Sequence, residues 1–357
     1  MTWDVAICGG GPAGLAAAIH SATRGFSTIV LERGVPPQDK ACGEGLMPRS
    51  LCALRKLGAL AALPPEQQAP FQGIRYVHAN GSIEARFRDG PGLGIRRTAL
   101  STALRQRANE AGATIRGTSV RAVRRGAIDT DSETIETRLV VGADGLNSAV
   151  RRHAGLDLPV RGPRRYGVRR HLAMAPWNDL VEVHWSDCGE AYVTPVGASC
   201  VNVAFLWHED ALPERASFES LLERFPALRN RVRDVPVESE ARGAGPLARR
   251  VRARTAPGIA LIGDAAGYVD AITGQGLSLA FTSAELLVRA LPAGLREPEL
   301  TRGLRRYDAS LRDEWLRYVL PARALLALAR RPPLRRGALR FVQRHPSWFA
   351  LLLRAVA

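Results

Sequence analysis

Lysine is almost absent from this chain of 357 residues, since Lys40 and Lys56 are the only lysines among its 50 basic residues. Paired cysteines are missing too: the five cysteines are odd in number, scattered, and never spaced as Cys-x-x-Cys. That pattern argues against a disulfide framework and against a zinc site, and it suits a reducing compartment. We therefore expect no bound metal and a cytoplasmic protein.

The sequence also lacks a signal peptide and an uninterrupted apolar run. Met1 leads directly into the apolar stretch Trp3–Cys8, without a basic region and an apolar core of leader length. The most apolar longer segment, residues 258–281, contains Asp264, Asp270 and five glycines, which predicts a strand, a loop and a helix rather than a membrane span. The length predicts two or three subdomains with a large buried core.

Acidic residues are missing from the last 37 positions, which contain eight of the arginines behind the net charge of +16. Residues 298–329 are rich in Leu, Ala and Arg and predict a long helix. Pro332 and Pro333 should break that helix, and we expect two short helices after them, at 334–343 and 347–355.

The end of the chain mixes apolar and basic side chains. They are Trp348, Phe349, Leu351, Leu352 and Leu353, flanked by Arg340, Arg344 and Arg354. Two interpretations stay open: residues 333–357 contact anionic lipid as a peripheral helix on the inner face of the membrane, or they pack over their own domain with the arginines outward. Nucleic-acid binding is not expected, because no recognition fold accompanies the charge.

A glycine-rich turn stands between two apolar stretches near the start of the chain. Trp3–Cys8 has the length of a strand, an Ala-rich helical segment follows the turn, and a second strand, Ser27–Leu31, ends in Glu32. In the spacing Gly-x-Gly-x-x-Gly, the glycines permit a tight turn, close approach of a pyrophosphate and close helix–strand packing. The helix N-terminus would attract phosphate, and Glu32 would accept from ribose hydroxyls. The unit predicts an adenine dinucleotide.

Two further strands lead into Gly-Asp turns much later in the chain. The first turn is Gly-Ala-Asp-Gly with Asp144 as its acid, and the second contains Gly263 and Asp264. The second turn is followed by Gly274-Gln275-Gly276 and by an apolar helix at 277–291.

With these three glycine motifs in this order, nearly the whole chain resembles the FAD-dependent family that contains aromatic hydroxylases, flavin halogenases and geranylgeranyl reductases. The resemblance implies an α/β fold: a Rossmann-like FAD-binding domain of the glutathione-reductase type, an inserted antiparallel-sheet substrate domain and a C-terminal helical segment. The implied bounds are 1–70, 96–155 and 256–295 for the FAD-binding domain, 71–95 and 156–255 for the substrate domain, and 296–357 for the basic tail.

The resemblance also implies individual FAD contacts. Glu32 would bind the ribose, and Asp264 would bind ribitol or pyrophosphate. A helix N-cap is the alternative for Asp264, and both roles can hold together. Arg97 matches an FAD-contacting arginine or is a solvated surface residue, with Thr98 as the expected N-cap of its helix. The backbone of 274–276 would face the flavin N1/O2 edge, where a helix N-terminus offers N–H donors and a positive dipole end to the negative charge of a reduced flavin. The full expected set is Gly9, Gly11, Pro12, Ala13, Gly14, Glu32, Arg33, Cys42, Gly43, Arg97, Asp144, Gly263, Asp264, Gly274, Gln275 and Gly276.

The loop Asp39–Pro48 contains Cys-Gly-Glu-Gly, which resembles geranylgeranyl reductases more than phenol hydroxylases. Its Cys42 would pack against the flavin or a substrate alkene, or be a small buried hydrophobic residue without a chemical role. Tyr192–Pro195 resembles the family's aromatic-x-x-Pro strand beside the flavin.

Successive short strands predict the sheet of the substrate domain. They are expected at 166–174, 180–186, 191–195 and 200–207, with a hairpin of 73–78 and 83–87 that turns at Asn80-Gly81. Candidate pocket residues on these strands are Arg169, His171, His184, Trp185, Tyr192 and Thr194, each of which fits a purely structural strand position as well. We regard Cys42, His184 and Tyr192 as the first candidates and assign no catalytic residue.

Because only one complete Gly-x-Gly-x-x-Gly is present, NAD(P)H would dock transiently as the reductant, or another protein would supply electrons. We favour a flavin monooxygenase of secondary metabolism that hydroxylates a hydrophobic aromatic or polyketide-like molecule. The alternative is a geranylgeranyl-reductase-like flavoprotein that reduces C=C bonds of a prenyl or lipid substrate. Halogenation is not expected without a Trp-x-Trp-x-Ile-Pro segment and a suitably placed lysine. A non-enzymatic carrier is not expected, because all three motifs are intact.

Overall fold

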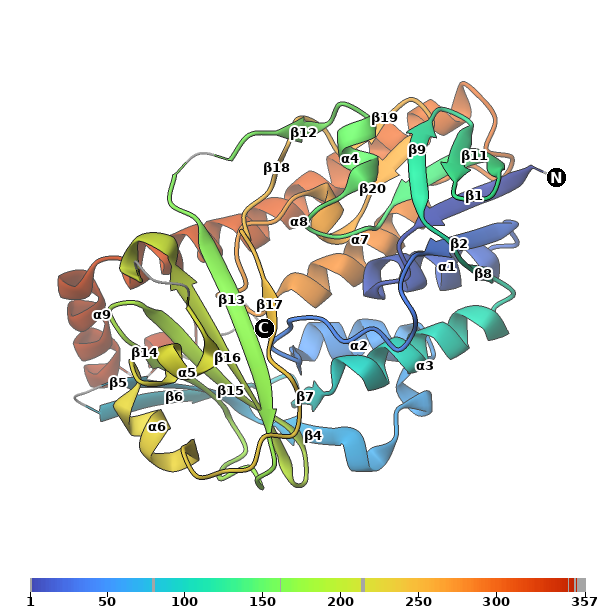
Figure 1. Ribbon diagram of the computed structural model, residues 1–357. Helices are drawn as coiled ribbons and strands as arrows, with labels where there is room; N and C mark the ends of the chain where they lie inside the picture. Colours follow the sequence, from blue (N-terminus) through green and yellow to red (C-terminus); the bar gives the residue numbers. More distant parts are fainter. Residues whose placement is uncertain are drawn as a thin grey trace.

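Two β-sheets divide the molecule into halves, and one long helix, α8, runs along both of them (Figure 1). The computed structural model describes residues 2–78, 81–160, 162–212, 216–345, 347–349 and 351. The first sheet contains the N-terminal strand, and the second sheet lies in the other half beside α9 (Figure 1).

The first sheet has a parallel centre in the order β20-β11-β1-β2-β8, with β19, β10 and β9 added antiparallel at its margins. Val5 is paired with Leu139 on one side and with Thr28 on the other. The central strands are buried on both faces, as expected for apolar parallel strands covered by helices. The strands are β1 (Trp3–Cys8), β2 (Thr28–Glu32), β8 (Thr114–Gly117), β9 (Val120–Arg124), β10 (Ala127–Thr130), β11 (Thr134–Gly142), β19 (Thr255–Ala256) and β20 (Ile259–Leu261).

Helices cover this sheet. The Ala-rich α1 packs between α3 and α7, where its small side chains allow close approach. A short 3-10 turn, Gly263–Ala266, follows β20 and leads toward α7. The helices are α1 (Pro12–Thr23), α2 (Pro48–Lys56), α3 (Arg97–Glu110), α4 (Ala149–His153) and α7 (Gly276–Ala290).

The second sheet has the strand order β17-β13-β16-β15-β14-β5-β6. The expectation of a wholly antiparallel sheet was wrong at one place: β14 and β5 pair in parallel, with His184 opposite Val77. This pairing arises because β5 and β6 come from an earlier part of the chain and join the edge of the later meander. The strands are β5 (Gly73–His78), β6 (Gly81–Arg86), β13 (Arg165–Leu172), β14 (Val181–Trp185), β15 (Gly189–Gly197), β16 (Cys200–His208) and β17 (Arg242–Ala244).

The expected β5–β6 hairpin forms, but β6 begins at Gly81, which is paired with His78 and is not a turn residue. Gly81 has a φ of +130°, which favours glycine. The expected turn residue Asn80 lies outside the described residues. On the outer face of the sheet, Phe205 packs against Phe218 of α5 (Phe218–Leu222) and Phe225 ahead of α6 (Pro226–Val232), with ring centroids 5.0 and 5.4 Å away.

Smaller sheets join the halves. β3 (Gly45–Leu46) and β4 (Gln68–Phe71) flank β7 (Gly92–Ile95), and β12 (Asp157–Leu158) pairs with β18 (Arg250–Val251). The backbones of β7 and β15 approach closely at Gly94, where a Cβ would lie 1.6 Å from the Pro195 carbonyl oxygen.

The C-terminal region forms α8 (Glu299–Ala329) and α9 (Pro332–Arg344). Two tyrosine hydroxyls of α8 hold the first half: Tyr307 donates to the Leu261 carbonyl at 2.6 Å, and Tyr318 donates to the Asp270 carbonyl at 2.9 Å. Pro332 occupies the first position of α9, where the missing N–H of proline costs no hydrogen bond. Of the expected apolar and basic cluster, Leu352, Leu353 and Arg354 lie outside the described residues. None of the described helices combines the length and the apolar character that a membrane crossing needs.

Candidate functional site

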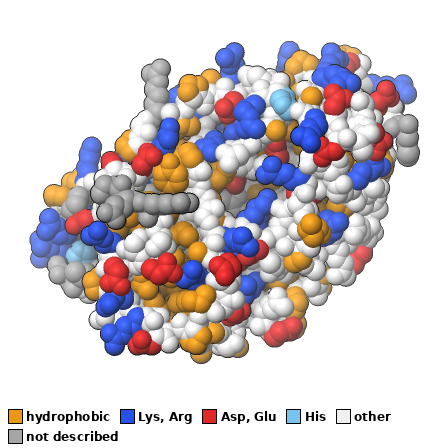
Figure 2. All heavy atoms as spheres, in the orientation of Figure 1, with side chains coloured by type: hydrophobic (Ala, Val, Ile, Leu, Met, Phe, Trp, Pro, Cys, Tyr) orange, Lys and Arg blue, Asp and Glu red, His pale blue; other side chains and the backbone are white. Residues whose placement is uncertain are grey.

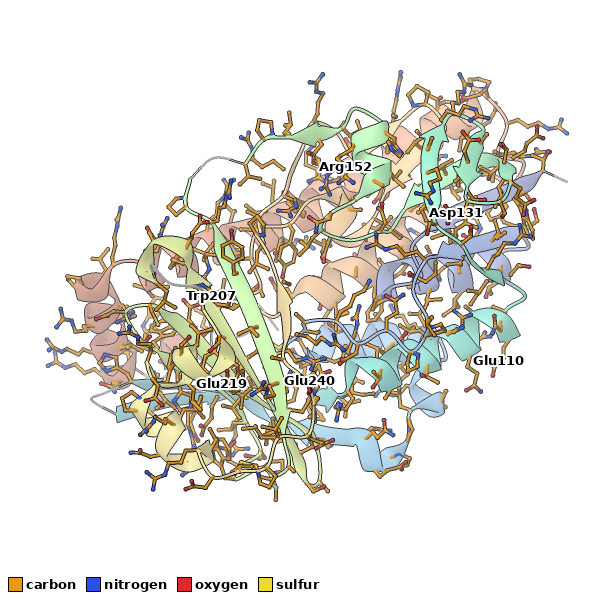
Figure 3. The ribbon with its side chains drawn as sticks, in the orientation of Figure 1. Glu110, Asp131, Arg152, Trp207, Glu219 and Glu240 are labelled. Atoms are coloured by element: carbon orange, nitrogen blue, oxygen red, sulfur yellow. The ribbon has the colours of Figure 1, made fainter. Side chains whose placement is uncertain are left out.

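A cavity of about 1720 Å³ lies between the halves. The turn after β1 walls one end, and the second sheet with α8 and α9 walls the other. Arg152 of α4 and Trp207 of β16 both line it, one from each half (Figure 3). A pocket for one drug-sized ligand measures roughly 300–1,000 Å³, so this cavity has room for a dinucleotide together with a second molecule.

The glycine turn forms the first wall. Gly9 has a φ of +110°, and a Cβ there would lie 2.5 Å from the Ala143 carbonyl oxygen. At Gly11 a Cβ would meet no atom within 4 Å, because this position faces the cavity. No side chain caps the N-terminus of α1 behind it. An anion in this part of the cavity would therefore meet free N–H groups and a positive dipole end.

Glu32 lines the cavity at the end of β2. Its Oε2 accepts from the Gly10 N–H at 2.7 Å, and its Oε1 accepts from the Gly34 N–H at 2.9 Å. The two backbone donors fix the carboxylate while each oxygen keeps a further lone pair. Glu32 is therefore oriented to accept from a hydroxyl pair.

The two carboxylate oxygens of Asp144 have different surroundings. Its Oδ2 accepts from the N–H groups of Ala149 and Val150 at 2.6 and 3.2 Å, at the start of α4. Its Oδ1 is buried and has no hydrogen-bond partner among the described residues, although Asp144 lines the cavity. A buried acceptor without a donor is costly, so a hydroxyl-bearing ligand in the cavity would satisfy it.

Asp264, Arg97 and Lys40 line the same part of the cavity. Burial raises the pKa of Asp264 to about 6, although Arg97 and Lys40 act in the opposite direction. Burial also lowers the pKa of Lys40, which the sequence analysis left out of the FAD site. An acid beside two cations tolerates a nearby pyrophosphate better than an isolated carboxylate, and it can bind a hydroxyl.

The expected Thr98 cap was wrong, and the alternative of a cap at Asp264 does not form either. The turn at Gly263–Ala266 has Ile262 in the cap position and no side-chain cap, so Asp264 does not cap it. The helix α3 begins at Arg97 itself, one residue before the expected Thr98 cap could act. In place of that cap, the Arg97 N–H donates to Glu44 Oε1 at 2.7 Å.

At the far end of this wall, Gly274 has a φ of +67°, and a Cβ there would meet no atom within 4 Å. Gly276 begins α7, and both glycines line the cavity. A flat ring could approach this backbone without meeting a Cβ, and it would face the positive end of α7.

Three expected FAD residues do not line the cavity. A Cβ at Gly14 would lie 1.9 Å from the Gly9 carbonyl oxygen, and one at Gly263 would lie 2.8 Å from Ala13 Cβ. Gln275 occupies the cap position of α7. The cavity is lined by the other thirteen: Gly9, Gly11, Pro12, Ala13, Glu32, Arg33, Cys42, Gly43, Arg97, Asp144, Asp264, Gly274 and Gly276.

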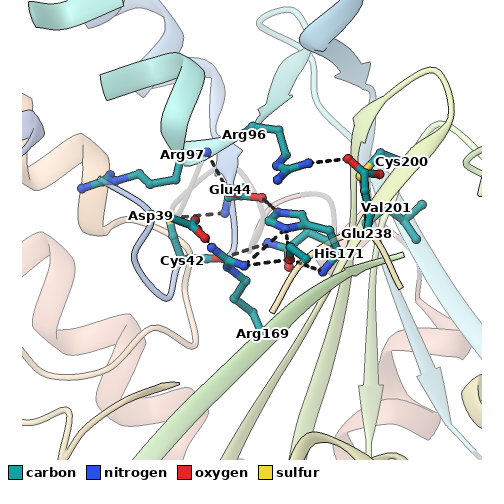
Figure 4. Close-up of polar contacts among 12 residues, drawn as sticks. Asp39, Cys42, Glu44, Arg96, Arg97, Arg169, His171, Cys200, Val201 and Glu238 are labelled. Atoms are coloured by element: carbon teal, nitrogen blue, oxygen red, sulfur yellow. Dashed lines mark hydrogen bonds and ion pairs between the residues drawn. The ribbon is translucent and has the colours of Figure 1, made fainter. Parts of the chain in front are cut away.

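The Cys42 loop is clamped to the second sheet through Glu44 (Figure 4). Glu44 has a φ of +59° and is 2% exposed. Its Oε2 lies 2.5 Å from His171 Nε2, and His171 Nδ1 lies 2.7 Å from the Ser239 hydroxyl. Arg169 adds an ion pair to Asp39 of the same loop. His171 therefore belongs to this clamp and does not line the cavity, whereas Arg169 does both.

Cys42 itself lines the cavity, and its carbonyl oxygen accepts from Asn202 Nδ2 at 2.8 Å. Burial raises the pKa of the Cys42 thiol, so it is protonated near neutral pH. The sequence analysis included Glu44 in the loop but did not predict that it anchors the loop to the second sheet. A charged residue between two glycines would have been the signal for such an anchor.

A second buried cluster was missed altogether. Arg165 Nη2 lies 2.5 Å from Glu190 Oε2, and Arg165 Nε lies 3.0 Å from Asp270 Oδ2. Arg165 Nη1 also lies 3.1 Å from His208 Nε2. Burial raises the pKa of Asp270 to about 6 against the effect of Arg165, and burial together with Arg165 lowers the pKa of His208 to about 4. The cluster ties the second sheet to the segment before Gly274.

Of the remaining pocket candidates, Trp185, Tyr192 and Thr194 line the cavity. The Tyr192 hydroxyl donates to the Ile272 carbonyl oxygen at 3.3 Å. His184 was wrong as a pocket candidate: its Nε2 lies 3.1 Å from Glu182 Oε2, away from the cavity lining. Burial opposes the ionised form of Glu182, but hydrogen bonds from His184 and its neighbours lower the pKa to about 2.

The second sheet and the C-terminal helices form an apolar arm of the cavity. It is lined by Ile74, Ile83, Val181, Val183, Leu320, Leu325, Leu328, Ala338, Leu339, Val342 and Phe349. In the described part of the chain, no group of three His, Cys, Asp or Glu side chains could hold a metal ion.

A βαβ turn with open glycines, a buried acid at the end of the second strand and an uncapped helix N-terminus define a dinucleotide-binding oxidoreductase fold. Over residues 2–314 the chain matches the FAD binding domain family, and it belongs to that family. The family resemblance seen in the glycine motifs is thus confirmed, and the protein is an FAD-dependent oxidoreductase.

Its sequence is similar to several reductases. It is 27% identical over 316 residues to menaquinone reductase of Mycolicibacterium smegmatis, covering 82% of this chain and 76% of the relative. It is 30% identical over 310 residues to digeranylgeranylglycerophospholipid reductase 2 of Methanothermobacter thermautotrophicus, covering 80% and 77%. It is 28% identical over 343 residues to the chloroplastic geranylgeranyl diphosphate reductase of Arabidopsis thaliana, covering 85% and 70%.

Solved structures share the fold. The flavin-dependent brominase Bmp2 superimposes with a TM-score of 0.86 at 16% identity, covering 100% of this chain and 93% of that chain. PqsL of P. aeruginosa, in complex with 2-aminobenzoylacetate, gives a TM-score of 0.78 at 21% identity, covering 94% and 98%. At these identities the likeness concerns the fold alone.

Proposed function

We propose that this protein is an FAD-dependent reductase that saturates C=C bonds of a prenyl-chain lipid, with NAD(P)H as the reductant. The observation that carries the proposal is the apolar arm, which continues from the nucleotide part of the cavity to α8 and α9. A branched aliphatic chain needs a long apolar channel, whereas a small aromatic molecule needs only a short pocket. This was the alternative in the sequence analysis, and it now takes precedence over hydroxylation.

The residues of the nucleotide part fit FAD. The turn at Gly9–Ala13 and the α1 N-terminus would hold the pyrophosphate, and Glu32 would hold the ribose. Asp144 Oδ1 would accept from a hydroxyl of the cofactor, which gives the buried oxygen a partner. Arg97 would contribute positive charge, and Gly274 would lie against the flavin edge.

FAD supplies two-electron redox chemistry when bound. Each saturated double bond takes a hydride equivalent from NAD(P)H and a proton, and NAD(P)⁺ leaves. The chain orients the alkene and excludes water with the apolar arm. The clamp through Glu44 holds Cys42 in the wall as a neutral thiol, which suits packing against an alkene and not nucleophilic attack.

The names of the sequence relatives support this substrate class, because those relatives are reductases of menaquinone and of geranylgeranyl compounds. One observation favours the hydroxylase as a second candidate. Tyr76, Trp185, Tyr192 and Trp207 bring aromatic rings to the cavity, with Tyr76 and Trp185 centroids 5.1 Å apart, and such rings would suit a planar aromatic substrate.

The oxygen requirement separates the two functions. The FAD-loaded protein is given NADPH and a geranylgeranyl lipid in detergent, with and without oxygen, and products are analysed by mass spectrometry. A reductase yields products that gain two hydrogens per double bond under anaerobic conditions. A product that gains an oxygen atom, and only in air, would overturn the proposal in favour of hydroxylation.

A matched pair of variants tests the apolar arm. Ala338→Trp places a large side chain in the arm, and Ala327→Trp places the same side chain on the exposed face of α8. We expect Ala338→Trp to slow lipid turnover at least about tenfold, and Ala327→Trp to leave it unchanged. Equal turnover by both variants would contradict a substrate in the arm, provided that their Tm values match.

A further inference from the structure

Exposed apolar side chains are concentrated in the C-terminal helices. Among the described residues, nine large hydrophobic side chains are exposed, and six of them lie on α8, on α9 or just after α9. The six are Leu316 (49% exposed), Leu320 (63%), Leu334 (52%), Phe341 (49%), Trp348 (51%) and Leu351 (54%). We call this surface the α8–α9 patch. Isolated exposed hydrophobic residues are ordinary, but a group of this size marks an interaction site.

The helix α9 presents two different apolar faces. Leu339 and Val342 point inward and pack with Phe349 against Ile83 of the second sheet. Leu334 and Phe341 point outward, seven residues apart, and the Phe341 ring lies 6.3 Å from that of Trp348. The outward face is therefore not needed to fill the core of this chain.

A row of arginines runs beside that outward face. Arg336, Arg340 and Arg344 follow one another at intervals of four residues, which places them on one side of α9. Figure 2 shows Lys and Arg side chains gathered at the end of the molecule where Figure 1 places α9. The row cannot be neutralised from its own segment, because no acid occurs after position 320. An apolar stripe bordered by arginines complements an anionic interface.

The patch adjoins the cavity at Leu320. Leu320 is 63% exposed and at the same time lines the cavity. Leu339 and Val342 line the cavity from the inner face of α9. The apolar arm thus reaches the surface beside the exposed apolar side chains.

We infer that the α8–α9 patch docks this protein on an anionic lipid bilayer, with the apolar arm opening toward the membrane. Phe341, Trp348 and Leu334 insert among the acyl chains, and Arg340 and Arg344 bind lipid headgroups. The docking follows from the surface alone. The passage of a substrate from the bilayer into the arm rests on the proposed function.

The headgroup contacts are tested by co-sedimentation of the FAD-loaded protein with phosphatidylglycerol/phosphatidylcholine vesicles. The variant Arg340→Gln/Arg344→Gln is expected to bind about 30-fold more weakly, since each arginine near an anionic surface strengthens binding severalfold. The control Arg289→Gln/Arg305→Gln removes the same charge near the packing of α7 on the first half of α8, and it should bind as the wild type does. High salt should weaken wild-type binding, and pure phosphatidylcholine should not replace the anionic vesicles.

The apolar contacts are tested by Phe341→Ser/Trp348→Ser, which should also release the protein from anionic vesicles while its FAD absorbance stays unchanged. Equal vesicle binding by wild type and both double variants would overturn the inference. So would wild-type dimerisation in sedimentation velocity that is lost in Phe341→Ser/Trp348→Ser, because the patch would then bind a second copy of the chain.

Activity separates this inference from the proposed function. Docking variants should reduce turnover of a prenyl lipid embedded in anionic vesicles and leave turnover of the same lipid in detergent unchanged. Absence of turnover in both settings, with vesicle binding intact, would remove the reductase proposal and leave the docking surface. Turnover with normal vesicle dependence in the docking variants would remove the docking surface and leave the reductase.

Discussion

The two halves of this molecule line one cavity with different kinds of chemical groups. On the side of the first sheet, the wall is mostly backbone: open glycines, an uncapped helix N-terminus, and a carboxylate held by two N–H groups. On the side of the second sheet, two buried polar clusters stand behind a mostly apolar wall. Arg165, Glu190 and Asp270 form one, and Glu44 and His171 form the other. The first wall suits a charged dinucleotide, because backbone dipoles stand beside Arg97 and Lys40. The second wall suits the apolar molecule that the proposed function calls for.

The two halves should therefore respond differently to amino-acid substitutions. The glycine turn needs the space that a side chain would fill, so a single added methyl group should disturb either its packing or its binding of the dinucleotide. The ion clusters depend on complete partnership, because an unpaired buried charge costs much more than a lost neutral contact.

The largest effect should come from glycines three residues apart. Gly14→Ala puts a Cβ 1.9 Å from the Gly9 carbonyl oxygen and should destabilise the fold by more than about 4 kcal/mol. Gly11→Ala meets nothing and has a compatible φ of −76°, so it should stabilise the apoprotein by about 0.4–1 kcal/mol while weakening FAD binding. Urea unfolding and FAD titration measure the two effects. Similar stabilities for the two variants would refute the division of roles.

The next largest effect should come from the Glu44 clamp. Glu44→Ala removes the buried carboxylate that both His171 Nε2 and the Arg97 N–H contact, and it should cost ~2–5 kcal/mol of unfolding free energy. Arg86→Ala removes an exposed ion pair with Asp179 in the same half and should leave Tm nearly unchanged. Thermal unfolding of both variants gives the comparison. A small effect of Glu44→Ala would mean that the loop is held by other contacts.

The smallest effect concerns pH. Asp270 has a folded-state pKa of about 6, above the ordinary value of 3.8, so its contribution to stability is present below pH ~4 and is lost as pH rises through ~6. A shift of this size corresponds to at most about 3 kcal/mol. Asp270→Asn should remove that part of the pH dependence, and the exposed-site control Asp234→Asn should keep it. Urea unfolding of the apoprotein between pH 4 and 7 measures this. Parallel curves for Asp270→Asn and wild type would count against a raised pKa.

Much of the first half was predictable from spacing. Gly9, Gly11 and Glu32 lie where the βαβ pattern put them, because the conformation of a tight turn is set by a few neighbouring residues. The helix cap was predicted less well. Thr98 does not cap α3, and the Arg97 N–H donates to Glu44 at the start of the helix instead. That partner is 53 residues away and could not be read from local preference.

In the second half, the strands could be predicted from the sequence, but which of their side chains line the cavity could not. The strand positions of His171 and His184 look alike in sequence, and both side chains are buried beside a carboxylate. One carboxylate belongs to the Cys42 loop and the other to the strand of His184 itself, so only the first pair anchors the cavity wall. The parallel pairing of β14 with β5 was equally invisible, because it joins segments on either side of α3 and β11.

The sequence by itself determined the dinucleotide turn, the order of the three glycine motifs, and the basic, acid-free end of the chain. These features are local, since φ preferences, helix dipoles and charge act over a few residues. Only the tertiary structure decided which charges are paired, that His184 faces away from the cavity, and that the apolar arm opens beside α9. Those outcomes depend on the packing of two sheets and a long helix, which brings side chains more than a hundred positions apart into contact.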